Sequence, residues 1–135
     1  VLSLMSDLQK QTGMAILLIT HDMGVVAAMA NTVGVIYAGN VVESAEVVPL
    51  FRRPQHPYTW SLLQALPRID DPGRRIEPLP GTPPDMIKLP AECPFLPRCF
   101  KAQSQCRTDP KPKLVEIEGM HFVACYNPVV PEEDD

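Results

Sequence analysis

Residues 14–22 read Met14-Ala15-Ile16-Leu17-Leu18-Ile19-Thr20-His21-Asp22, a continuous apolar run that ends in polar residues. A run of this length without alternation is typical of a strand buried on both faces of a parallel sheet, and we expect residues 14–19 to form one. Ligands bind outside the carboxyl ends of such strands, so His21 is placed for chemistry. On position alone, a polar strand end followed by a helix cap at Asp22 explains the same residues.

The segments on either side of this run predict helices and a hairpin. The first segment predicts an amphipathic helix that ends at Gly13, and its apolar face is formed by Leu2, Leu4, Met5 and Leu8. A helix over 23–30 leads to a second apolar strand at 33–37, and residues 41–42 return across the turn at 38–40. Farther on, His56-Pro57-Tyr58-Thr59 predicts a helix start, because proline suits the first helical position.

These patterns predict the α/β fold class, yet they leave the sheet short of strands. A strand buried on both faces needs neighbours on both sides, and no other segment is as apolar as residues 14–19. We therefore expect the chain to be a carboxy-terminal fragment of a larger protein, cut inside a helix.

Composition divides the 135 residues into unlike parts. Residues 1–66 hold the apolar strings, residues 67–128 form a proline-rich extension with all four cysteines, and 129–135 form an acidic tail that we expect to be disordered. The formal net charge of −4 argues against a nucleic-acid partner. No stretch approaches the roughly 18 apolar residues that a membrane span requires.

The four cysteines predict a metal centre. Cys93, Cys99, Cys106 and Cys125 lie in a segment with too few apolar residues to fold on burial alone. Thiolates in this number are ligands of soft metal centres. A bound metal or cluster is therefore the leading interpretation of the extension.

Three kinds of centre remain open on spacing alone. Disulfides require an oxidising compartment, and the sequence shows no secretory signal. Zinc is favoured by His121 lying four residues before Cys125, but the gaps of five, six and eighteen residues between the cysteines lack the usual close pair. An iron–sulfur cluster accepts wider gaps because its irons lie at the corners of a cube, although the spacing matches neither common ferredoxin pattern.

Several motifs together resemble a known family. Residues 12–23 resemble the segment around the switch histidine of ATP-binding-cassette (ABC) transporter ATPases. Residues 37–43, 51–59 and 62–67 resemble the oligopeptide and dipeptide importer branch. The segment Gly81-Thr82-Pro83-Pro84-Asp85 and the four cysteines resemble that branch's carboxy-terminal extension.

This resemblance implies a partial remnant of a P-loop-type ABC ATPase sheet and a parent protein that couples ATP hydrolysis to import of oligopeptides, dipeptides or related solutes. It implies that His21 contacts the γ-phosphate of ATP, which the parent binds with Mg²⁺. The implied partners are a second ATPase subunit, membrane permease subunits and, indirectly, a solute-binding protein. The implied location is peripheral, at the cytoplasmic face of a bacterial or archaeal membrane.

The resemblance also implies that Cys93, Cys99, Cys106 and Cys125 hold a [4Fe-4S] cluster, with Zn²⁺ as the alternative. The sequence has no phosphate loop, signature motif or acidic magnesium site, so we expect the fragment alone to be inactive and to self-associate through its incomplete sheet. The alternative function is an independent metal- or Fe-S-binding interaction or regulatory module without ATPase activity.

Overall fold

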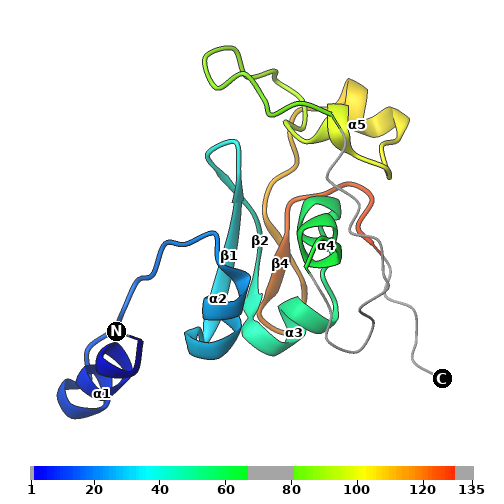
Figure 1. The fold of residues 1–135 in the computed structure, drawn as a ribbon. Helices are drawn as coiled ribbons and strands as arrows, with labels where there is room; N and C mark the ends of the chain where they lie inside the picture. Colours follow the sequence, from blue (N-terminus) through cyan, green and yellow to red (C-terminus); the bar gives the residue numbers. More distant parts are fainter. Residues whose placement is uncertain (1, 67–80, 130–135) are drawn as a thin grey trace, which may run out of the picture.

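The computed structural model describes residues 2–66 and 81–129, which include one four-stranded sheet. Its strands are β1 (Thr32–Tyr37), β2 (Asn40–Glu46), β3 (Val115–Glu118) and β4 (His121–Val123). They lie in the order β1-β2-β4-β3, and every neighbouring pair is antiparallel (Figure 1). The mixture of helices and sheet is consistent with the α/β class. The parallel pairing expected for residues 14–19 does not occur among residues 2–66 and 81–129.

The predicted hairpin is confirmed. β1 and β2 pair across a turn in which Ala38 and Gly39 have φ angles of 51° and 77°. Hairpin turns that match the strand twist require positive φ at both central residues, which glycine adopts without strain. The alternation of β1 buries Val33, Val35 and Tyr37 on one face, as a half-buried strand should.

The end of α1 and the starts of α2 and α4 lie where the local signals predict. They are α1 (Leu2–Thr12), α2 (Met23–Met29), α3 (Val47–Arg52), α4 (Pro57–Gln64) and α5 (Ser104–Thr108), with a 3-10 turn η1 (Leu96–Arg98). Gly13 follows α1 at φ 69°, and Asp22 caps α2 by accepting hydrogen bonds from the N–H groups of Gly24 (3.0 Å) and Val25 (3.3 Å). Pro57 opens α4 as predicted.

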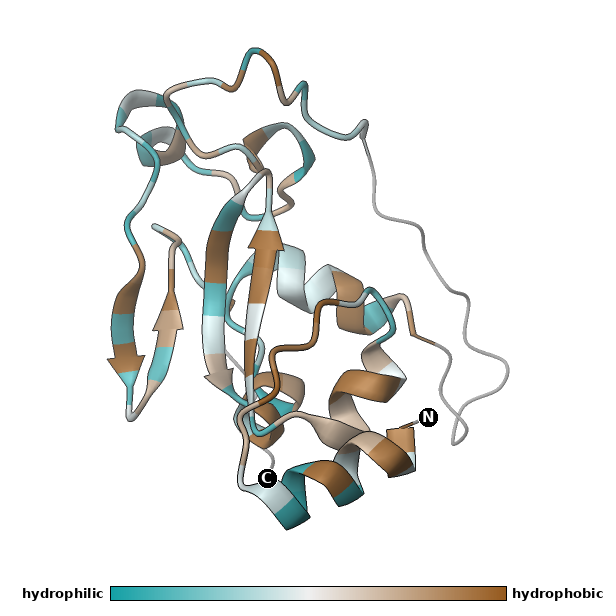
Figure 2. Cartoon of the chain, turned by 90° about the vertical axis from the view of Figure 1, so that its left-hand side faces the viewer, coloured by the Kyte–Doolittle hydropathy of each residue, from teal (hydrophilic) through white to brown (hydrophobic). Residues whose placement is uncertain are grey.

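The prediction of a buried strand at 14–19 is wrong in this structure. The segment has no regular secondary structure, and Leu17 and Ile19 are 89% and 88% exposed. A strand needs partners for its N–H and C=O groups. No strand among residues 2–66 and 81–129 pairs with residues 14–19. The segment instead connects α1 to α2. α1 lies apart from the sheet (Figure 1) and buries none of its residues, although several are hydrophobic (Figure 2).

One apolar core joins the two halves of the chain. It contains residues of β1, β2 and α3, among them Val35, Ala45 and the fully buried Leu50. Phe95 of the extension belongs to the same core and is 1% exposed. Its ring lies 5.2 Å from the ring centre of Tyr37 and 5.5 Å from that of Tyr58. The extension is therefore anchored to the sheet by an aromatic side chain as well as by the pairing of β4 with β2.

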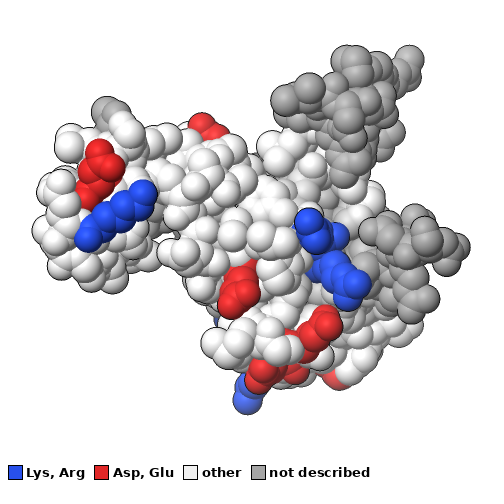
Figure 3. Space-filling view, turned by 90° about the horizontal axis from the view of Figure 1, so that it is seen from below, with Lys and Arg blue, Asp and Glu red and all other residues white. Residues whose placement is uncertain are grey.

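The described surface shows mixed charge. On the face seen in Figure 3, Lys and Arg side chains lie near Asp and Glu side chains instead of gathering in one basic stripe. None of the helices described is long and apolar enough to cross a bilayer. The predicted acidic tail falls almost wholly outside the described residues, as does the first part of the connector that follows residue 66.

Candidate functional site

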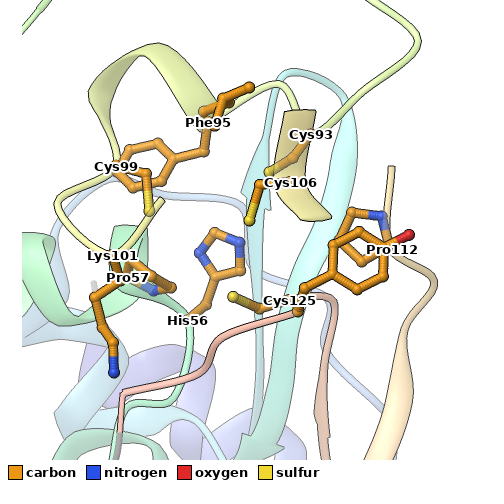
Figure 4. Close-up of a pocket in the computed structure, with 11 residues that line it drawn as sticks. His56, Pro57, Cys93, Phe95, Cys99, Lys101, Cys106, Pro112 and Cys125 are labelled. Carbon is orange, nitrogen blue, oxygen red and sulfur yellow. The ribbon is translucent and has the colours of Figure 1, made fainter. Parts of the chain in front are cut away.

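The structure brings the four cysteines of the extension to one pocket. Cys93 and Cys99 flank η1, Cys106 lies in α5, and Cys125 follows β4. All four line the same cavity, and Figure 4 shows their sulfur atoms facing a common space. All four are free thiols, so the disulfide alternative is not formed here.

Hydrogen bonds from the protein itself hold the cysteine-bearing segments together. Lys101 Nζ donates to the Pro128 carbonyl at 3.0 Å, and Asn127 Nδ2 donates to the Lys101 carbonyl at 3.0 Å. Gln103 Nε2 donates to the Tyr126 carbonyl at 3.2 Å. These bonds join the loop between Cys99 and Cys106 to the segment around Cys125, so the pocket has a scaffold independent of any bound metal.

The pocket favours thiols over thiolates when nothing is bound. Burial raises the pKa of Cys93 and Cys99, and it raises the pKa of Cys125 to about 12. Negative charge on the neighbouring cysteines raises each of these pKa values further. Because metal ligation requires thiolates, four of them can share this space only around a cationic centre.

The donor set of the pocket is four cysteine side chains. Within 2–66 and 81–129, no three His, Cys, Asp or Glu side chains are grouped so that they could hold one metal ion. A [4Fe-4S] cluster binds each thiolate through a different iron, so its ligands lie farther apart, and four cysteines are its usual ligand set.

His121, which made zinc attractive in the sequence, lies elsewhere. It does not line the cysteine pocket, and its Nε2 lies 2.5 Å from Glu43 Oε2. The two side chains are buried, with Glu43 fully inaccessible. Four residues of separation from Cys125 therefore do not place this histidine beside that thiol.

Glu43 joins three segments of the chain, a role that the sequence did not predict. Its carboxylate accepts hydrogen bonds from the backbone N–H groups of Gln55 and His56, both at 2.8 Å, in addition to its contact with His121. It thereby connects β2, the start of α4 and the strand that leads to Cys125. A glutamate in a strand gives no local sign of such partners, because they lie 12, 13 and 78 residues away.

His56 is the second residue whose position the sequence did not predict. Its motif predicted a helix start and core packing, and it does cap α4, since the Tyr58 N–H donates to His56 Nδ1 at 3.0 Å. It also lines the cysteine pocket and is 1% exposed. Burial lowers the pKa of His56 to about 4, so the imidazole is neutral at physiological pH.

The predicted catalytic residue His21 lies outside this pocket. It is exposed and precedes the capping residue Asp22, whose N–H donates to Thr20 Oγ1 at 3.0 Å. All four cysteines therefore line one pocket, and His21 does not line it.

Residues 42–106 match the family model described as "Oligopeptide/dipeptide transporter, C-terminal region". The chain belongs to this family. The matched segment of the transporter family includes Glu43, His56 and three of the four cysteines, whereas His21 and Cys125 lie outside it.

Three relatives show how far the similarity extends. The oligopeptide transport ATP-binding protein OppD of Salmonella typhimurium is 39% identical over 129 residues, which is 96% of this chain and 38% of the relative. OppD of Haemophilus influenzae is 40% identical over 82% of this chain and 34% of its own length. The dipeptide transport ATP-binding protein DppD of Caldanaerobacter subterraneus is 35% identical over 93% of this chain and 38% of its own length.

The chain thus spans less than two fifths of the length of these curated relatives. All three are named as ATP-binding transport proteins, so the alternative of an independent module without ATPase function gains no support.

The Glu43 contacts predict a large effect on stability. Glu43→Gln replaces one acceptor oxygen by an NH₂ group, which must face a backbone N–H or His121 in a buried site. We expect the free energy of unfolding to fall by about 3 kcal/mol, measured by urea denaturation of anaerobically prepared protein. Glu46→Gln, on an exposed residue of the same strand, is the control and should change it by less than about 0.5 kcal/mol. Equal effects would contradict the role assigned to Glu43.

Proposed function

We propose that the chain is the carboxy-terminal part of the ATP-hydrolysing subunit of an ABC importer for oligopeptides, dipeptides or related solutes. The observation that carries this proposal is the 39% identity to an oligopeptide transport ATP-binding protein across 96% of the chain. On this proposal the intact protein binds ATP and Mg²⁺ and works with a second ATPase subunit, with permease subunits and, indirectly, with a solute-binding protein. It would lie peripherally at the cytoplasmic face of the membrane.

His21 is the residue of this chain that we assign to ATP hydrolysis. An exposed imidazole can reach the γ-phosphate of a nucleotide held by other parts of the intact protein. There it would stabilise charge that develops on the transferred group and help to orient water. The chain has no G-x-x-x-x-G-K-[ST] motif, so this histidine has no nucleotide to act on in the isolated 135 residues.

Substitution of His21 in the intact ATPase should separate turnover from binding. We expect His21→Ala to lower kcat by about 100-fold, because the lost interaction is made mainly in the transition state, while the Kd for ATP changes little. Turnover assays and nucleotide titration measure the two quantities, with Gln11→Ala, an exposed residue of α1, as the control. Hydrolysis by the isolated chain that survives His21→Ala would sink this assignment.

We further propose that Cys93, Cys99, Cys106 and Cys125 are the ligands of a [4Fe-4S] cluster with a structural role in the extension. What supports this is that four free thiols line one cavity. When bound, the cluster would supply the positive charge that lets four buried thiolates coexist. It would also add folding free energy to its segment.

Chemical analysis of protein made without oxygen tests the cluster. We expect iron and sulfide near the four of each that the cluster requires, together with a broad visible absorption band. Cys106→Ser should lose most of both and loosen residues from about 90 to 125 in hydrogen exchange. Ser104→Ala, an exposed neighbour in α5 that does not line the pocket, should lose neither. One equivalent of zinc, or no metal at all, would refute the proposal.

The fragment should also self-associate. Leu17 and Ile19 expose nearly their whole side chains, and the backbone between Gly13 and Thr20 has no strand partner among the described residues. A second copy would cover this segment. Light scattering should show dimers or larger species that the double substitution Leu17→Asp and Ile19→Asp reduces to monomer, and that Gln11→Ala leaves intact. A monodisperse wild-type monomer at high concentration would count against this.

A further inference from the structure

The imidazole of His56 occupies an unusual place for a helix cap. It points into the space between the sulfur atoms of Cys99, Cys106 and Cys125, whereas a capping side chain ordinarily lies at the surface (Figure 4). It is the most deeply buried of the titratable side chains that line the pocket, at 1% exposed.

Two hydrogen bonds fix this residue, and the one at the ring determines where the ring proton lies. The His56 N–H donates to Glu43 Oε1 at 2.8 Å, which holds the backbone. The Tyr58 N–H donates to His56 Nδ1 at 3.0 Å, so Nδ1 must offer a lone pair and cannot carry a proton. The ring is therefore the neutral tautomer with its hydrogen on Nε2, and its face is supported by Phe95 at 5.7 Å between ring centres.

We propose that His56 is a positioning residue for the cysteine-bound centre, whose Nε2–H donates a hydrogen bond to one of the sulfur atoms of that centre. This inference rests on the proposed [4Fe-4S] cluster and deepens it. The cluster core and its four thiolates together are anionic, and a donor aimed at a sulfur is a recognised means of tuning such a centre. The α4 cap and the cluster site would then share one side chain, through its two different nitrogens.

The proposal has a consequence that capping alone does not have. A hydrogen bond to sulfur stabilises the more negative, reduced form of a cluster more than the oxidised form, so it raises the reduction potential. It also helps to retain iron, because outer-shell partners of metal ligands typically contribute tenfold or more to metal affinity. A residue that only capped α4 would affect folding and leave the potential unchanged.

Two substitutions separate the two nitrogens. His56→Asn keeps a capping oxygen near the position of Nδ1, since Asn is a good N-cap, but its side chain is too short to reach the sulfurs. His56→Gln is a poor cap, yet its amide N–H₂ reaches close to the position of Nε2. His56→Asn therefore removes the hydrogen-bond donor to sulfur and keeps the cap, whereas His56→Gln keeps the donor and removes the cap.

The test uses the intact anaerobic protein and measures three quantities for wild type and both variants: the midpoint potential of the centre, the rate of iron loss to a chelator and the urea unfolding midpoint. We expect His56→Asn to lower the potential and to speed iron loss by about tenfold with little change in unfolding. We expect His56→Gln to retain a potential near that of wild type while unfolding at lower urea.

The outcomes distinguish this inference from the proposed function. If wild-type protein contains no iron and sulfide, the proposed cluster fails and this inference fails with it. If wild-type protein contains the cluster but His56→Asn has the wild-type potential, the cluster stands and the role of His56 is refuted. The same holds if the potential and the rate of iron loss change only in His56→Gln, the variant that lacks the cap.

Discussion

The buried carboxylate of Glu43 is the interaction on which the rest of this structure depends. It is fully inaccessible, and its two oxygens accept from the N–H groups of Gln55 and His56 and contact His121. Three segments that are distant in sequence meet at this one group, and removal of any partner would leave a buried polar group unsatisfied. The position of α4 and of the strand before Cys125 therefore follows from one side chain of β2.

This arrangement explains how an irregular, proline-rich extension reaches a defined position. Phe95, between Cys93 and Cys99, is buried in the same core as β1 and β2, and β4 adds a strand next to β2. The extension thus relies on the first half of the chain for apolar burial and for backbone pairing. A cluster at the four cysteines would balance the charge of the thiolates and add folding free energy to the segment from about 90 to 125.

The two proposed sites occupy separate parts of the chain. His21 follows the exposed segment after α1, and the cysteine pocket is formed by η1, α5, the start of α4 and the residues after β4. β1 and β2 lie between them in the sequence and carry Glu43, the group that holds the pocket side together.

The sequence by itself determined the features that arise from neighbouring residues. The hairpin of β1 and β2, the Gly13 end of α1, the Asp22 cap and the proline start of α4 all follow from backbone preferences and capping over a few residues. The four cysteines were also recognisable in the sequence as candidate metal ligands, from their residue type alone. Only the tertiary structure decided that residues 14–19 are not a strand here, that His121 pairs with Glu43 and that His56 enters the cysteine pocket. Strand formation and buried polar pairs require partners from distant segments, and no local pattern specifies which partners the fold provides.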